Sequence, residues 1–259
     1  ASEESENSGV VEVDLALDEF YLLDLEVRDL ALKSTHGKGL FIIDGVTAEV
    51  NDGSIEGRVA ASQKGGATDV SVDLSVSKLP IHHILSILAV PDREPMSGEL
   101  TAQVLLDGRI GNDDGEKTAL SGHIKGVLRE PVFPSSDSGQ SPWLTPVLGA
   151  LRLPSIENVH FDRVFASVQL DGEVAEVEDL SLDGDLLKLM SSGKVSLVNN
   201  VGETRLELPV DVLIEEGVGS KSGLPLNLNG SIPGFGLLPS FLSIQGDLGD
   251  PRFEVDRIA

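Results

Sequence analysis

Apolar and polar residues alternate along most of this chain, and that alternation limits the possible folds more than any other feature. The longest run places five aliphatic residues at every second position from 206 to 214, and shorter runs recur from residue 11 to residue 170. Successive side chains of a β-strand point to opposite faces, so each run describes a strand with one apolar and one polar face. The sequence therefore predicts antiparallel strands with one face in water.

Turn residues separate many of these runs. Asp-Gly pairs tolerate the positive φ angles of tight turns, and Asn-Gly pairs do the same, so both predict hairpins between alternating strands. Together, the runs and turns predict about fourteen strands. The pairs begin at Asp44, Asp52, Asp107, Asp114, Asp171, Asp183 and Asn229.

Only two segments show helical spacing. The first has Ile81, Ile84, Leu85 and Leu88 between Pro80 and Pro91, and the second has Trp143, Val147, Leu148 and Leu151 between Pro142 and Pro154. Proline favours the first turn of a helix and ends a helix that it follows. The Pro/Ser-rich stretch 130–142 between them predicts a loop and a possible subdivision of one domain spanning residues 10–259. Residues 1–9 are predicted to form a flexible acidic lead-in.

Two short helices cannot cover the apolar faces of about fourteen strands, which leaves a sandwich, a closed barrel or an open curved sheet. The apolar positions are mainly Val, Leu and Ile, and only 4% of the residues are aromatic. An aliphatic lining suits acyl chains, because each buried methylene gains about 0.8 kcal/mol without directional bonding. An ordinary sandwich core remains an equal alternative at this point.

Charge and composition exclude several functions. The chain has 43 acidic and 19 basic residues and no cysteine. The formal net charge of −24 argues against nucleic acid as a partner and against electrostatic attraction to anionic lipid headgroups. The five histidines and the many carboxylates lack metal-ligand or catalytic spacing, so we expect no metal, no cofactor and no enzymatic activity. One Trp and one Tyr are too few for a surface that stacks sugars.

The termini also carry information. The chain opens ASEESENSGV without an initiator methionine, and no apolar run reaches 18 residues. We expect that a leader or membrane anchor has been removed, or that the sequence is a piece of a longer chain.

Four stretches of the chain share a recognisable order of elements, which includes a proline-headed helix between strands and the closing motif GDLGDPRFEVD. The stretches are Leu22 to Ser62, Asp73 to Gly108, Phe161 to Asn200 and Leu224 to Asp256. Their order and spacing, more than any single motif, resemble the C-terminal region of the AsmA-like proteins of two-membrane bacterial envelopes.

The resemblance implies an all-β fold, a long twisted antiparallel sheet curved into an open, taco-like groove. It implies a non-enzymatic periplasmic protein, anchored to the inner membrane through a segment absent here, that binds lipid acyl chains and takes part in phospholipid transfer between the inner and outer membranes. The alternative implied function is outer-membrane protein assembly, or a structural role in a secretion system, with envelope proteins bound at the sheet edges.

The longest alternating runs give the candidate groove lining. The same residues would form the core if the sheet were closed. They are Val70, Val72, Leu74, Val76, Val164, Val168, Leu170, Leu206, Leu208, Val210, Val212 and Ile214.

Overall fold

In the residues that the computed structural model describes, fourteen β-strands form one antiparallel sheet. The structure describes residues 9–22, 25–65, 67–81, 97–111, 118–132, 147, 149, 151, 161–198, 201–228 and 232–255. The prediction of an all-β, open antiparallel sheet is confirmed. The strands are β1 (Val11–Leu22), β2 (Leu25–Gly37), β3 (Leu40–Val50), β4 (Gly53–Lys64), β5 (Ala67–Pro80), β6 (Ser97–Gly111), β7 (Ala119–Val132), β8 (Phe161–Gly172), β9 (Val174–Gly184), β10 (Leu187–Ser196), β11 (Arg205–Glu215), β12 (Phe235–Leu237), β13 (Leu242–Asp247) and β14 (Asp250–Val255).

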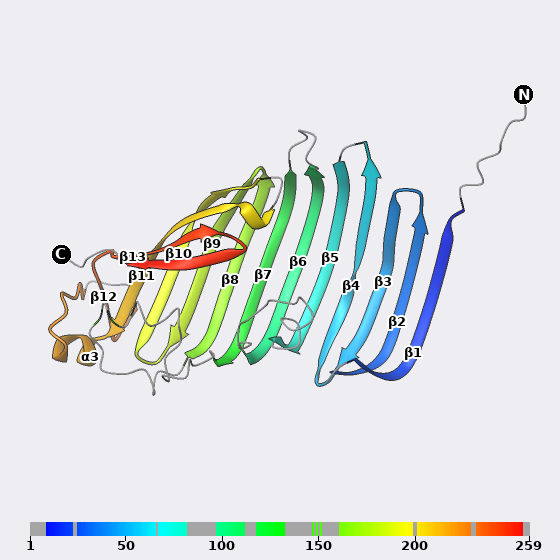
Figure 1. The fold of residues 1–259 in the computed structure, drawn as a ribbon. Helices are drawn as coiled ribbons and strands as arrows, with labels where there is room; N and C mark the ends of the chain where they lie inside the picture. Colours follow the sequence, from blue (N-terminus) through cyan, green and yellow to red (C-terminus); the bar gives the residue numbers. More distant parts are fainter. Residues whose placement is uncertain are drawn as a thin grey trace, which may run out of the picture.

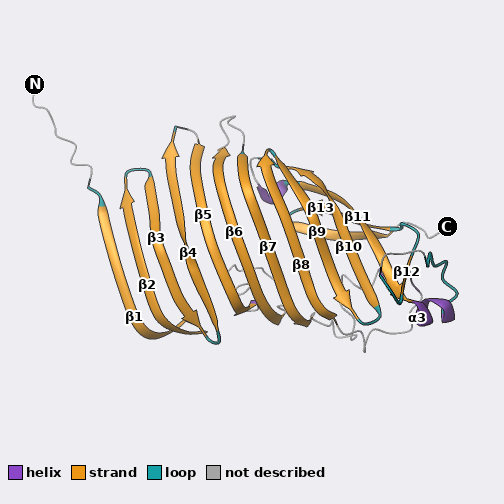
Figure 2. Cartoon of the chain, turned by 180° about the vertical axis from the view of Figure 1, so that it is seen from behind, coloured by secondary structure: helices purple, strands orange, loops and turns teal. Residues whose placement is uncertain are grey.

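The strands follow one another as a meander from β1 to β11, and then through β13 to β14. Strand β11 pairs with β10 on one side, and with β13 and β12 on the other. Figures 1 and 2 show β1 to β8 side by side in one long twisted row. In the described part of the chain, β1 pairs only with β2 and β14 only with β13, so the sheet does not close.

Three of the Asp-Gly pairs lie at hairpin turns, as predicted. Asp52-Gly53 connects β3 to β4, Asp171-Gly172 ends β8, and Asp183-Gly184 ends β9. The short, polar aspartate and the flexible glycine fit the reversal of the chain there. The pairs that begin at Asp114 and Asn229 fall outside the described residues.

Two other pairs were wrongly interpreted as turns, because they lie inside strands. Asp44-Gly45 sits where the β3–β4 register shifts, which marks a β-bulge. Gly108 lies within β6 with a φ of 151°, and a Cβ there would come within 2.2 Å of the Ala119 carbonyl oxygen. Glycine at these positions thus permits a bend or a close approach of neighbouring strands rather than a turn.

Helices contribute little to the described structure. Of the first predicted helix, only Ile81 is described, and it is helical. In the second, the described residues Val147, Gly149 and Leu151 are helical. A short helix that was not predicted, α3 (Glu216–Lys221), follows β11, and the backbone N–H of Val218 donates to the Glu215 carboxylate at 2.8 Å. No described helix has the length and apolar character needed to span a bilayer.

The expected loop at residues 130–142 lies mostly outside the described residues, and its first three residues belong to β7. Strands β7 and β8, on either side of it in the sequence, pair along Leu120–Arg129 and Arg163–Gly172. The sheet is therefore continuous across this point. A division into subdomains stays a prediction.

Candidate functional site

Strand register aligns the apolar residues of successive strands into rows that cross the sheet. Directly paired residues of an antiparallel ladder project on the same side. One row, which we call the first row, contains Ile43, Val59, Val72, Leu106, Gly122, Leu170 and Ala175.

Three more rows run beside the first, each two residues further along the strands or beyond a bulge. We call this side of the sheet the apolar face. The second row is Val46, Gly57, Leu74, Val104, Ile124, Val168 and Val177; the third is Ala48, Ile55, Val76, Ala102, Gly126, Ala166 and Leu180; the fourth is Leu79, Leu100, Leu128, Val164 and Leu182.

No position in these four rows carries a polar or charged side chain. In the third row, Ala102, Gly126 and Ala166 are consecutive cross-strand partners on β6, β7 and β8. These residues have small side chains or none. In the second and fourth rows, on the two sides of the third row, the same three strands carry Leu, Val and Ile.

Charged groups gather on the opposite face. Asp69 accepts a hydrogen bond from Arg109 at 2.8 Å and forms an ion pair with Lys64 at 3.2 Å. Hydrogen bonds from Arg109 and Lys64 lower the pKa of Asp69 below its usual value. The alternation thus separates the sheet into one apolar and one ionic surface.

A second aspartate on this ionic surface lies near the C-terminal end of the sheet. Arg163 donates to Asp183 at 2.6 Å and Lys188 at 3.1 Å. Burial raises the pKa of Asp183, but the hydrogen bonds from Arg163 and Lys188 lower it more, so the pKa falls below the usual aspartate value. The carboxylate therefore stays ionised, paired and away from the apolar face.

The apolar face is covered differently along the sheet. We call β1–β7 the open half and β8–β14 the closed end. In the open half, most members of the first and second rows are only half-buried, among them Val59, Val72, Leu74 and Val104. In the closed end, Leu170 and Ala175 of the first row are buried, whereas Val168 and Val177 of the second row are still half-buried. The first row therefore passes from partly accessible to enclosed along the sheet.

The last strands provide the cover at the closed end. Figures 1 and 2 show the sheet turning over after β8, so that β13 crosses β9 and β10. One buried cluster joins Leu182 of β9 to Leu242 of β13 and to Phe241, and Phe253 of β14 packs against it. Val147 belongs to the same cluster and has no exposed surface. The core of the closed end thus forms between strands that are distant in sequence.

All twelve residues predicted as groove lining project onto the apolar face, although their environments differ. Val70, Val72, Leu74 and Val76 lie together on β5 and are half-buried. Strand β8 contributes half-buried Val164 and Val168, together with Leu170, which is buried. The five on β11 are buried in the core, with exposures of 8% or less. They are Leu206, Leu208, Val210, Val212 and Ile214.

Sequence reasoning missed the central strands β6 and β7 as part of the lining. Val104 and Leu106 of β6, and Ile124 of β7, lie between the candidates on β5 and β8. On β7, the apolar alternation is interrupted by Gly122 and Gly126, which hid the pattern. Counting glycine as compatible with an apolar position would have revealed it.

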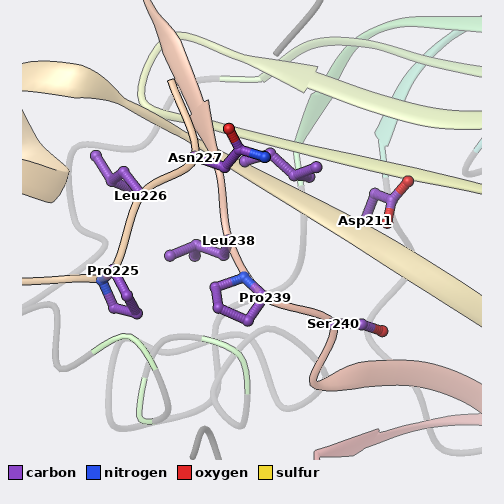
Figure 3. A pocket seen from close by; sticks show the side chains of 8 residues that line it. Asp211, Pro225, Leu226, Asn227, Leu238, Pro239 and Ser240 are labelled. Atoms are coloured by element: carbon purple, nitrogen blue, oxygen red, sulfur yellow. The ribbon is translucent and has the colours of Figure 1, made fainter. Parts of the chain in front are cut away.

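The pocket in Figure 3 lies elsewhere, beside β11, and none of its lining residues belongs to the four rows. It is a shallow hollow of about 520 Å³ between β11 and the segments 225–227 and 237–240. Pro225, Leu226 and Pro239 form much of its wall, and Asp211 is its one ionisable residue. A single carboxylate without a basic partner in the wall gives no basis for acid–base catalysis.

Metal binding finds no support in the described residues, where no three His, Asp or Glu side chains gather as a possible site. The chain was also compared with family models, curated proteins and solved structures. None of these comparisons finds a match. The resemblance to AsmA-like proteins therefore stays a prediction.

Proposed function

We propose that the apolar face of the open half binds lipid acyl chains, and that the protein takes part in phospholipid transfer between the inner and outer membranes without catalysing a reaction. One observation carries this proposal: four apolar rows run across neighbouring strands between β3 and β9, and in the open half the members of the first and second rows are only half-buried. A soluble protein rarely leaves a large apolar surface uncovered without a binding role.

The dimensions of the rows fit an acyl chain. Strands are spaced about 4.8 Å apart, so the five steps from β3 to β8 span about 24 Å. One leaflet contributes about 15 Å of hydrocarbon to a bilayer, so an acyl chain can lie fully along a row. Each methylene that leaves water for the face gains about 0.8 kcal/mol.

The chemistry of the rows also suits movement. Polar side chains would create preferred stopping points, whereas consecutive Val, Leu, Ile, Ala and Gly residues offer similar contacts at each step. The small residues Ala102, Gly126 and Ala166 would leave a furrow between the second and fourth rows, which gives an acyl chain a lateral boundary without hydrogen bonds. The ionic surface on the other side of the sheet keeps the protein in water and repels anionic headgroups there.

Native mass spectrometry after purification without denaturing detergent tests the proposal. We expect phospholipid to accompany the wild-type chain and to be lost from the double variant Val72→Asp/Leu74→Asp, because carboxylates in the first and second rows disfavour apolar contact. The matched control is Ser71→Asp/Ser75→Asp, which adds the same charge to the same strand on the polar face. A lipid-free wild type, or equal lipid in both variants, would contradict the proposal.

A filling variant tests the furrow. Ala102→Leu/Ala166→Leu keeps the face apolar but raises the low part of the third row. We expect slower transfer of a fluorescent phospholipid between vesicles, while circular dichroism remains that of the wild type. Unchanged transfer would place the acyl chain outside the furrow.

A second function, assembly of envelope or secretion-system proteins, is favoured by one observation. Within the described residues, β1 is a long edge strand, and several of its aliphatic residues are exposed. Unpaired strand edges bind extended segments of other proteins. Capture of a defined envelope protein by wild-type chain but not by a β1 variant would support this function.

A further inference from the structure

On the side away from β10, the pairing of β11 is interrupted over two residues. Strand β13 pairs with Arg205–Val210 of β11, and β12 pairs with Leu213–Glu215. Residues 211 and 212 therefore lie between the two partner strands, where the chain that connects β12 to β13 passes beside β11. The Leu238 N–H donates there to the Val212 carbonyl oxygen at 2.9 Å. The hollow of Figure 3 opens at this interruption.

The walls of the hollow are held by the rest of the closed end. Asn227 and Leu237 exchange two backbone hydrogen bonds, of 2.9 and 3.1 Å, which join the two wall segments. Leu238 is 3% exposed and belongs to the buried cluster of the closed end, and Leu226 packs against that cluster. A hollow of about 520 Å³ with such walls is pre-formed, and its volume is in the range of small-molecule sites.

One charged group accompanies the apolar walls. Figure 3 shows the labelled proline and leucine side chains on one side of the hollow, and Asp211 and Ser240 on the other. Asp211 is exposed, and within the residues that the structure describes it takes part in no ion pair. Lys188 lies diagonal to it on β10, but its Nζ is 3.1 Å from the Asp183 carboxylate and 5.1 Å from the centre of the Phe235 ring. The charge of Asp211 is therefore available to a ligand.

The composition of the wall distinguishes between classes of ligand. Asp211 and the net charge of −24 both repel an anion. A metal ion needs several ligands, and the wall offers a single carboxylate. An uncharged apolar molecule would gain nothing from that carboxylate. An organic cation with an aliphatic body uses both the charge and the apolar walls.

We propose that this hollow binds a small organic cation, with its ammonium group beside Asp211 and its aliphatic body against Pro225, Leu226 and Pro239. The negative field of the chain raises the local concentration of such cations. An exposed ion pair adds up to about fivefold in affinity, and contact with the apolar walls supplies the rest. The inference does not depend on whether the apolar face of the sheet carries lipid.

Ligand titration followed by NMR of the isotope-labelled full chain tests the proposal. The probes are cyclohexylmethylamine, cyclohexylmethanol and cyclohexanecarboxylate, which share one ring and differ in charge. We expect the amine to bind with a dissociation constant of about 1–10 mM. It should shift the amide signals of residues 211, 226 and 238, and bind more weakly at high salt. The alcohol should bind about three- to fivefold more weakly than the amine, and the carboxylate more weakly than the alcohol.

Two substitutions at Asp211 change the charge without disturbing the core, because this side chain is exposed. Asp211→Asn should lower the affinity for the amine to that for the alcohol, and Asp211→Lys should bind the carboxylate more tightly than the amine. The matched control is Asp73→Asn, which removes an exposed carboxylate from β5, outside the hollow. It should leave the order of the three affinities unchanged.

Three results would overturn the proposal. These are no binding of the amine at up to about 50 mM, equal binding of the amine and the alcohol by the wild type, and shifts by the amine that are confined to residues of the four apolar rows. None of them bears on lipid binding by the open half. The two proposals can therefore fail separately.

Discussion

Strands β5 and β11 carry the same sequence pattern but lie in different environments. Each places aliphatic residues at every second position of one face. The four on β5 are half-buried, whereas those on β11 have exposures between 0% and 8%. The difference arises from what packs against each strand: Phe241 and the helical residues Val147 and Leu151 share a buried cluster with the apolar residues of β11. Alternation thus determines which face is apolar, and distant segments determine whether that face is enclosed.

This contrast separates two functions of a single surface. The closed end supplies a packed core of the kind that stabilises a domain. The predictions below compare matched residues in the two regions and begin with the largest effect.

Removing a large ring from each region should separate the two regions most clearly. Phe241 is 2% exposed in the core of the closed end, whereas Phe41 of β3 is 42% exposed. We expect Phe241→Ala to lower the free energy of unfolding by about 3–5 kcal/mol. Phe41→Ala should lower it by less than about 1 kcal/mol. Urea unfolding followed by circular dichroism measures both, and similar losses would show that the open half is as well packed as the closed end.

A pair of leucines tests the same contrast on the candidate lining itself. Leu208 on β11 is 3% exposed, and Leu74 on β5 is half-buried. We expect Leu208→Ala to cost about 3 kcal/mol and Leu74→Ala about 1 kcal/mol. Added phospholipid should stabilise the wild type more than Leu74→Ala, because Leu74 contacts lipid in the proposed function. An equal lipid effect on both proteins would remove Leu74 from the lining.

The sequence was sufficient to predict the strands and their faces, because alternation is a local property. The twelve candidate residues all project onto one face for this reason. Two Asp-Gly pairs misled the prediction, since a glycine in a bulge or a close strand contact has the same local signature as one in a turn. Gly108 illustrates this: its role depends on the Ala119 carbonyl oxygen of the next strand.

The enclosure of β11 could not be predicted in the same way. Phe241 and Val147 pack in the same buried cluster as Val210, Val212 and Ile214, although they lie about 30 and about 65 residues away in the sequence. No local periodicity reports such packing. The sequence therefore left an open groove and a closed core as alternatives, and the structure contains both, in different parts of one sheet.

Glycines on β7 test how the central sheet keeps its shape between the two regions. Gly122 has a φ of 136°, and a Cβ there would lie 2.0 Å from the Leu105 carbonyl oxygen. Gly122→Ala should therefore cost about 1–3 kcal/mol through backbone strain. At Gly126 the nearest atom to an added Cβ is 3.9 Å away.

Gly126→Ala is the matched control on the same strand and the same face. We expect its unfolding free energy to be unchanged or raised by about 0.5 kcal/mol, because alanine restricts the unfolded chain more than glycine does. Thermal unfolding measures the pair. If both substitutions were neutral, the close approach of β6 and β7 would not require glycine.

The smallest expected effect is at two aspartates, one in each region. Each of them is bound by an arginine and a lysine. Asp183 and Lys188 at the closed end have side-chain exposures of 17% and 19%. In the open half, Asp69 is 32% exposed and Lys64 is 71% exposed. Solvent screens the second group more strongly, so Asp183→Asn should cost about 1 kcal/mol at neutral pH, and Asp69→Asn should shift the urea midpoint less.

The pH dependence gives this prediction its sign. The pKa of Asp183 is lower in the folded chain than in an unfolded one, where the pKa of aspartate is about 3.9. The ionised carboxylate therefore stabilises the fold above that value, and the stabilisation is lost as the pH falls through the lower folded-state pKa. The wild type and Asp183→Asn should differ in urea midpoint at neutral pH and converge in acid. A difference that persisted after the carboxylate is protonated would show that Asp183 acts through packing at the closed end, and not through its charge.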